Sequence, residues 1–416
     1  MVLLYQKAGI IMIISKALLC DINGERLCDL RVEDGFIVEI AENISGDKRI
    51  ELDGAYLLPG LVDTNVLPRD GQINGATLER LAKKALSGGV STAVLLPETT
   101  PSIDDEIVLE FVQNQRYHED GATLEASIAT INSEGGMSNI AILLKRGAVA
   151  PYVRSSAKNN TFCRIAEYAK MCGVTLFVRA EDESLAQDGV MNEGEVAGKL
   201  GLAGISPLSE ILHVSRFIEL ARFYEIKIVF KSIVQPRSLE LIKKAKQEGV
   251  AVQAEVSLHH LVLNDKACED FNTTAKIDPP LVEQSAMLEL QEALKRGDID
   301  MLTLLQQSQS DINKKVAFAE AKYGSDALGE ALSLYYTKLV KSGWIDMPTL
   351  IKLTCKNSAA SIAKDAGEIK VGQVCDMVVF DTTKSTKIEN ASSLYDKEEL
   401  SGMVSMAFMD DAVIKF

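Results

Sequence analysis

Apolar runs and amphipathic stretches alternate through the middle of the chain. Short runs rich in valine, isoleucine and leucine predict strands. They lie at residues 92–97, 123–131, 174–180, 227–234, 250–257 and 298–305. Amphipathic stretches precede them, and two of these, 78–89 and 237–250, carry lysines shortly before a glycine, as helices do at their ends. This alternation predicts a parallel α/β sheet. The number of repeats favours a closed (β/α)8 barrel of the TIM type, with functional residues at the carboxyl ends of its strands.

Both ends of the chain differ from the middle, because short β-rich runs are separated there by turn residues. We therefore expect residues 12–58 and 365–416 to form one small β-sandwich and residues 59–364 to form the barrel. Residues 1–11 have an apolar start without a small-residue cleavage pattern, and Met12 opens the first strand-like run. We expect a leader there that is not a signal peptide.

Composition and charge narrow the function classes. The chain has 416 residues, 47% of them hydrophobic, which is enough for a large core. An excess of 59 acidic over 44 basic residues gives a net charge of −15, which argues against binding to nucleic acid. No apolar run reaches the roughly 18 residues of a membrane span, so we expect a cytoplasmic protein.

The cysteines predict neither a disulfide framework nor a zinc knuckle. Seven of them are scattered along the chain without a C-x-x-C pair. An odd, dispersed set of this kind is typical of reduced thiols that are buried as small hydrophobic side chains.

Several long stretches carry motifs in a fixed order and spacing. Residues 58–69 read LPGLVDTNVLPR, and residues 91–105 read STAVLLPETTPSIDD. Residues 179–210 begin RAEDESL, and AEVSLHHLVL at 254–263 is followed by TTAKIDPPL at 273–281. Together these stretches resemble dihydroorotase and its relatives, hydantoinase and allantoinase, over residues 12–416. The resemblance implies an amidohydrolase barrel with a β-sandwich built from both termini.

The same resemblance implies a catalytic site built on zinc, in which the metal acidifies water and an aspartate accepts a proton. In this chain the positions of the metal ligands and of the aspartate hold other residues. They are Asn65 and Leu67 for the first histidine pair, Tyr152 and Val153 near the bridging lysine, Arg179 and Lys231 for the next two histidines, Leu305 for the aspartate, and Gln306 and Gln309 for the last histidines. Leucine offers no lone pair to zinc. We therefore expect no catalytic residue, no metal and no other cofactor.

Positions that resemble the substrate contacts have also changed. Arg69 matches the arginine that grips the dihydroorotate carboxylate, while Glu98 and Asp278 stand where the family has asparagines. A carboxylate at Glu98 would repel an anionic substrate. Arg69 remains open to two interpretations, either an anion contact or a salt bridge at the barrel rim.

The cations at the metal positions suggest a replacement for the metal. Arg179 and Lys231 put fixed positive charge where zinc would sit, and we expect them near Asp63, Asp70 and Glu98 in an internal ion-pair network. A remnant anion pocket is the alternative. The histidine pair His259 and His260 has no H-x-H spacing, and we expect it to be structural.

Three functions are compatible with the resemblance. The first is a pseudoenzyme of pyrimidine biosynthesis, because inactive dihydroorotase-like chains assemble with the catalytic chain of aspartate carbamoyltransferase and support its activity. The same resemblance suggests a homodimer. The second is an active dihydroorotase or cyclic amidohydrolase with an atypical site, for which Asp63, Glu98, Glu181, Asp182 and His260 are the candidate acid–base groups. The third is a free-standing scaffold like the non-enzymatic dihydropyrimidinase relatives, which the dihydroorotase-like segment 191–196 disfavours.

Overall fold

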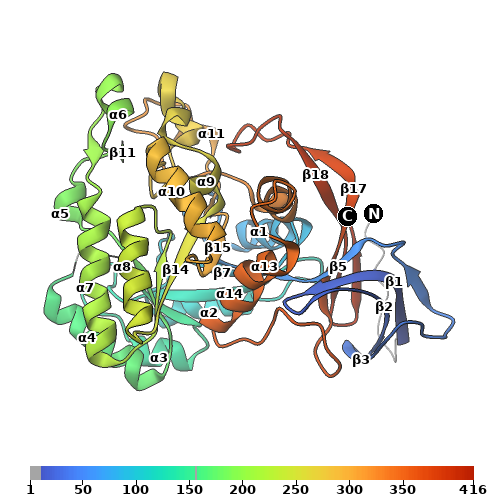
Figure 1. Ribbon diagram of the computed structural model, residues 1–416. Coiled ribbons are helices and arrows are strands. Elements are labelled where there is room, and N and C mark those ends of the chain that lie inside the picture. The colour runs from blue at the N-terminus through green and yellow to red at the C-terminus, as the bar shows by residue number, and fades with distance from the viewer. Residues whose placement is uncertain (1–10, 155–156) are drawn as a thin grey trace.

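A computed structural model describes residues 11–154 and 157–416, and its larger part is a barrel of parallel strands (Figure 1). The barrel strands are β6 (Leu61–Leu67), β7 (Val90–Leu95), β8 (Thr123–Ala129), β9 (Ala150–Val153), β10 (Leu176–Arg179), β13 (Ile228–Lys231), β14 (Val252–Ser257) and β15 (Met301–Thr303). Each pairs in parallel with the next, and β16 (Gln306–Gln307) pairs with β6 to bring the ends of the sheet together. The predicted parallel barrel is confirmed.

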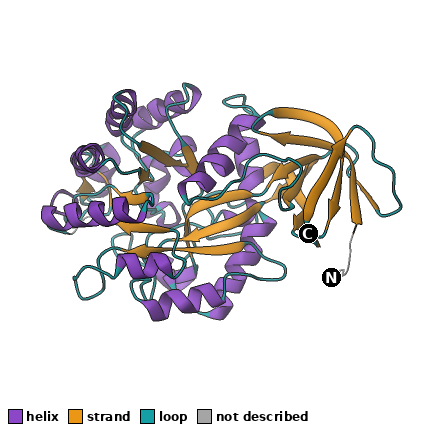
Figure 2. Cartoon of the chain, turned by 90° about the horizontal axis from the view of Figure 1, so that it is seen from below, coloured by secondary structure: helices purple, strands orange, loops and turns teal. Residues whose placement is uncertain are grey.

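Helices surround the barrel and cover the outer face of its strands (Figures 1 and 2). The longer ones are α1 (Gly75–Ser87), α2 (Glu106–Asn114), α3 (Ile140–Lys145), α4 (Asn159–Cys172), α7 (Leu208–Tyr224), α8 (Pro236–Gln247) and α10 (Gln284–Lys295). In α1 the side chain of Asn74 caps the first turn, and Leu78, Leu81 and Ala85 form its buried stripe. Because helices cover one face and barrel side chains the other, the strands are almost continuously buried.

Shorter elements carry the loops at the carboxyl ends of the strands and the return to the terminal sheet. They are η1 (Arg69–Gly71), α5 (Glu183–Ala186), β11 (Met191–Asn192), α6 (Glu195–Leu200), β12 (Gly204–Ile205), α9 (Leu258–Val262), η2 (Asp265–Phe271), η3 (Thr273–Ala275), α11 (Asp311–Lys314), η4 (Leu328–Glu330), α12 (Ala331–Tyr335), η5 (Tyr336–Val340), α13 (Met347–Ile351), η6 (Lys352–Lys356) and α14 (Asn357–Ser361).

Strands from both termini form the smaller part of the molecule (Figure 2). They are β1 (Ile11–Asp21), β2 (Gly24–Glu33), β3 (Phe36–Ala41), β4 (Arg49–Glu51), β5 (Tyr56–Pro59), β17 (Asp376–Lys387), β18 (Glu399–Met409) and β19 (Ala412–Lys415). They belong to one eight-stranded sheet in which β5 joins β1 to β17, and Leu30, Leu57 and Phe408 share its apolar core. The prediction that β-strands from both termini come together is confirmed, and they form one continuous sheet. The expected leader falls on residues 1–10, outside the described residues, and on Ile11, which begins β1.

Two barrel strands are shorter than their apolar runs predict. The run at 227–234 contains β13, which ends at Lys231, and the run at 298–305 contains β15, which ends at Thr303. Left-handed backbone follows both strands, at Ser232 (φ 51°) and Leu305 (φ 49°). Because left-handed residues do not continue a strand, the chain turns at these points.

The predictions about the cysteines and about membrane spans can also be compared with the structure. All seven cysteines are free thiols, and five of them are buried, as predicted. In residues 11–154 and 157–416, no helix combines the length and the apolar character needed to cross a membrane.

Candidate functional site

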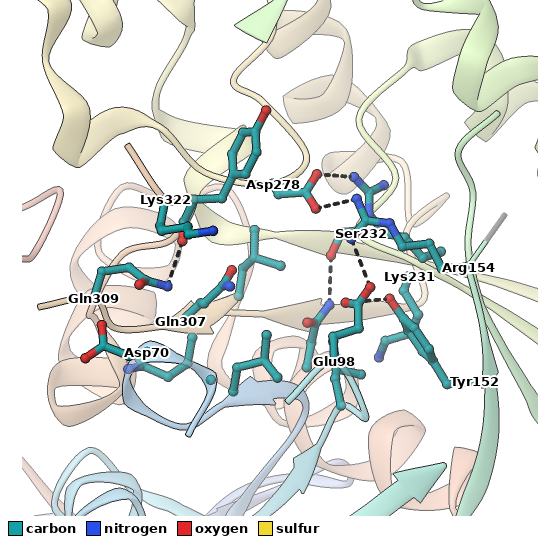
Figure 3. A pocket seen from close by; sticks show the side chains of 18 of the residues that line it. Asp70, Glu98, Tyr152, Arg154, Lys231, Ser232, Asp278, Gln307, Gln309 and Lys322 are labelled. Atoms are coloured by element: carbon teal, nitrogen blue, oxygen red, sulfur yellow. Dashed lines mark hydrogen bonds and ion pairs between the residues drawn. The ribbon is translucent and has the colours of Figure 1, made fainter. Parts of the chain in front are cut away.

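The carboxyl ends of the barrel strands meet at a cavity of about 290 Å³ (Figure 3). Most of the positions singled out from the sequence line it together. These are Asn65, Leu67, Glu98, Tyr152, Arg179, Lys231, Asp278, Leu305, Gln306 and Gln309. Two do not line it: Val153 is fully buried, and Arg69 lies in a neighbouring hollow. The structure thus gathers residues from widely separated parts of the chain into one site.

An ion-pair network crosses one side of this cavity (Figure 3). The Arg154 guanidinium lies 2.9 Å from Glu98 Oε1, 2.9 Å from Glu181 Oε2 and 3.0 Å from Asp278 Oδ2. The Arg179 guanidinium lies 2.7 Å from Asp278 Oδ1 and 3.7 Å from Glu181. The Tyr152 hydroxyl donates to Glu98 Oε2 at 3.0 Å. Two guanidiniums therefore hold three carboxylates at the barrel mouth.

The charges in this network stabilise one another. Burial alone would raise the pKa of Asp278, but Arg179 and Arg154 outweigh it and hold that pKa well below its ordinary value. Asp278 in turn raises the pKa of Arg154 against the effect of burial, with help from Glu98 and Glu181. Asp278 and both guanidiniums are consequently charged at neutral pH and paired.

A second, fully buried network lies beneath the first. The Lys231 ammonium donates to Glu255 Oε2, to the Thr64 carbonyl at 2.9 Å and to Thr64 Oγ1 at 2.7 Å. Asn65 Nδ2 donates to the other Glu255 oxygen at 2.8 Å and to Ser232 Oγ at 2.8 Å. Burial lowers the pKa of Lys231, and Glu255 acts in the opposite direction. Every donor of the ammonium has an acceptor, so Lys231 is held in one position.

The predicted network exists, but the predicted acidic partners of Arg179 and Lys231 are wrong. Asp63 instead accepts from Thr303 Oγ1 at 2.7 Å and from the Asn65 and Leu304 amides at 2.9 and 3.0 Å. Asp70 accepts from the Ser310 amide at 2.7 Å and Asn313 at 2.8 Å, outside the network. Of the three expected carboxylates, only Glu98 belongs to the network, and its partner is Arg154. Glu255 takes the position beside Lys231 because β13 and β14 are neighbours in the barrel.

The residues at the last three family positions support the loops of the mouth. Gln306 Nε2 donates to Asp326 at 2.8 Å, and its oxygen accepts from the Ala327 and Leu328 amides at 3.0 Å. Gln309 Nε2 donates to the Tyr323 carbonyl at 3.0 Å. Leu305 packs into an apolar cluster formed by the loops at the carboxyl ends of the strands and is 8% exposed. These side chains line the cavity and are at the same time held by contacts with neighbouring loops.

Both residues of the histidine pair are buried away from the cavity. His259 Nδ1 lies 2.8 Å from the Tyr395 hydroxyl. His260 bridges Ser257 Oγ at 2.7 Å and the Pro279 carbonyl at 3.0 Å. Burial lowers the pKa of His259 to about 3 and that of His260 to about 4. His260 is therefore neutral and enclosed, which removes it from the candidate acid–base groups.

Comparison with known proteins places the chain in a family. It is 33% identical to the dihydroorotase of Elusimicrobium minutum, covering 91% of this chain and 87% of that protein. It is 30% identical to the dihydroorotase of Caldanaerobacter subterraneus, covering 94% of each chain. A dihydroorotase-like protein of Pseudomonas aeruginosa is 30% identical over 87% of each chain. The chain belongs to the dihydroorotase family.

Solved structures agree on the fold of this dihydroorotase-family chain. The L-hydantoinase of Arthrobacter aurescens matches with a TM-score of 0.85 at 20% identity, covering 97% of this chain and 95% of that one. A D-hydantoinase from Thermus sp. matches with a TM-score of 0.81 at 19% identity, covering 97% and 94%. No protein-family profile matches the chain.

The zinc ion that the family resemblance implies does not fit the residues of this barrel. Leu67 and Leu305 have no donor atoms, and Arg179 and Lys231 carry positive charges within hydrogen-bonding distance of carboxylates that would otherwise ligate a cation. In the part of the chain that the structure describes, no group of three or more His, Cys, Asp or Glu side chains is arranged to hold a metal. The donor set of the mouth is therefore already neutralised by the protein's own cations.

Prediction from the sequence did not identify the residues that complete both networks. Arg154 follows β9, a four-residue strand too short to stand out as an apolar run. Glu255 and Thr64 match the family pattern or lie between motif positions, so neither is conspicuous. Lys231 was a usable signal for Glu255, because a buried ammonium requires a buried carboxylate partner.

Proposed function

We propose that this dihydroorotase-family protein is a non-catalytic subunit of pyrimidine biosynthesis that assembles with the catalytic chain of aspartate carbamoyltransferase and supports its activity. One observation carries the non-catalytic part. Lys231 and Arg179, at two positions that the family resemblance assigns to metal binding, form ion pairs with Glu255 and Asp278, and Arg154 also pairs with Asp278. We also propose a cytoplasmic homodimer as the form that takes part in this assembly.

Hydrolysis of a cyclic amide at neutral pH needs an activated water and a base with a free electron pair. Glu98, Glu181 and Asp278 are neutralised by guanidiniums, so a proton accepted by any of them would break an ion pair. Burial raises the pKa of Asp63 to about 6, but Asp63 does not line the cavity and both of its oxygens accept hydrogen bonds. These contacts oppose general-base catalysis by each of these carboxylates.

The proposed partner follows from the resemblance to inactive dihydroorotase-like chains. The test is to express the protein with and without the transcarbamoylase chain of the same organism and to measure carbamoyl-aspartate synthesis and elution volume. We expect the two chains to co-elute in a fixed ratio, with higher transcarbamoylase activity in the complex. A transcarbamoylase that is fully active and elutes alone in the presence of this protein contradicts the proposed role.

An active dihydroorotase is the second candidate, and the names of the relatives favour it, since chains 30–33% identical over about nine-tenths of this one are named dihydroorotase. Spectrophotometric assay of dihydroorotate ring opening, with zinc or manganese added, separates the two functions. With either metal, we expect the rate of ring opening to be no higher than the rate in buffer alone. Turnover that disappears in Glu98→Gln, while the exposed control Glu240→Gln retains it, would establish the enzyme and overturn the non-catalytic proposal.

A further inference from the structure

A second hollow of about 180 Å³ lies beside the cavity, and Gln306 and Gln309 line both. We call it the α1 groove, because Arg80 and Lys84, one helical turn apart on α1, line one wall. Arg69 of η1 and Asp326 line it as well. It differs in chemistry from the barrel mouth, where Arg154, Arg179 and Lys231 are each paired with a carboxylate.

The α1 groove has an excess of positive charge in a strongly acidic protein. Three cations and one carboxylate line it, whereas the whole chain has a net charge of −15. The carboxylate, Asp326, is 6% exposed and already bound by Lys84 Nζ at 2.5 Å, Gln306 at 2.8 Å and Asn390 at 3.0 Å. Asp326 is therefore unable to neutralise the two arginines as well.

The two guanidiniums have little to bind within the described part of the chain. The nearest carboxylate to Arg69 is that of Asp70, at 3.9 Å, and Asp70 is held by Ser310 and Asn313. Arg80 Nε donates to the Ala76 carbonyl of its own helix at 3.1 Å and forms no ion pair with the described residues. The terminal nitrogens of both side chains thus remain available to a ligand.

We propose that the α1 groove binds a small phosphate-bearing anion through Arg69 and Arg80. Two guanidinium forks match the oxygens of a phosphate group, which accepts paired hydrogen bonds from each. Lys84 is matched by Asp326, so the excess positive charge of the groove comes from the two arginines. A volume of about 180 Å³ suits a phosphate or diphosphate group. This site is independent of the proposed assembly and of whether the barrel mouth is catalytic.

Titration calorimetry of the isolated full-length protein with inorganic phosphate and with pyrophosphate tests the site. We expect saturable binding of one equivalent, weakened about tenfold or more in Arg69→Gln and in Arg80→Gln, since each removes a charge-assisted pair. The control is Arg237→Gln, which removes an equivalent exposed charge from α8, outside the α1 groove, and should leave affinity unchanged. Thermal unfolding without phosphate verifies that the variants fold, since both arginines are exposed.

Titrations with nucleotides and with succinate define the ligand. Tighter binding of UTP or ATP than of pyrophosphate identifies the phosphate as part of a nucleotide, and equal binding identifies the phosphate group alone as the ligand. Succinate that binds as tightly as phosphate would overturn the ligand class. Absence of binding up to about 10 mM phosphate, or equal weakening in Arg237→Gln, would overturn the site itself.

Discussion

Lys231 and Glu255 show how one pair of buried charges determines the chemistry at the centre of this barrel. Their side chains are 0% exposed and form an ion pair between neighbouring strands β13 and β14. Attraction between buried charges offsets their desolvation only where further hydrogen bonds complete the geometry. Thr64 and Asn65 supply those bonds here. The pair is therefore stable only as a complete set, which makes each member sensitive to mutation.

Glu255→Gln tests this interdependence. The variant leaves a buried ammonium without a counter-charge, so we expect a loss of about 3–5 kcal/mol in the free energy of unfolding, measured by denaturant titration. Adding Lys231→Met should recover most of the loss, because the unpaired charge is then removed. As a control, Glu240→Gln breaks the exposed pair with Arg237 and should change stability by less than about 1 kcal/mol. Equal effects of the two glutamine variants would contradict this account.

His213 makes stability depend on pH. It is fully buried between Phe162 and Phe217, neither ring nitrogen has a partner among the described residues, and burial lowers its pKa to about 3. The unfolded chain binds a proton at His213 near pH 6.5 and the folded chain does not, so this residue's contribution to stability is complete above pH 6.5 and is lost as the pH falls toward 3. The expected loss from this residue is about 2 kcal/mol at pH 5. His213→Phe should therefore show a smaller decrease in the free energy of unfolding between pH 8 and pH 5 than the wild type, and an unchanged decrease would refute the assignment.

At the scale of elements, the sequence predicted the barrel and the terminal sheet but not the ends of the strands. Apolar runs identify β8 and β14 because burial requires them, whereas β9 has four residues and no run of its own. The left-handed turns at Ser232 and Leu305 carry no glycine to announce them. The site positions came from motif spacing, while Arg154 and Glu255 were missed because their partners lie far away in the sequence.

The residues that follow two helices allow a test of the preference of glycine for left-handed backbone. Gly173 (φ 66°) follows the last residue of α4 and Glu225 (φ 55°) follows the last residue of α7, and both have left-handed backbone. Glycine adopts this conformation without strain, so Glu225→Gly should stabilise the protein and Gly173→Ala should destabilise it, each by about 1 kcal/mol. The lost Lys170–Glu225 pair is exposed and contributes little. Thermal unfolding measures the stability of both variants, and stability changes of the same sign would contradict this expectation.

At the scale of the whole molecule, the barrel has the architecture of the dihydroorotase family while ion pairs between its own side chains cross its mouth. A ligand that binds only the folded state at one hundred times its Kd stabilises a protein by about 2.7 kcal/mol. We therefore expect the thermal midpoint to be the same in zinc and in EDTA, and metal analysis after gel filtration to find no stoichiometric zinc.

Asn65→His combined with Leu67→His introduces two imidazoles but leaves Arg179 and Lys231 in place. If the cations exclude the metal, this double variant also stays free of zinc, because two ligands beside two fixed positive charges do not make a structural or catalytic zinc site. One equivalent of zinc in the double variant would show that missing ligands alone, and not the ion pairs, keep the metal out.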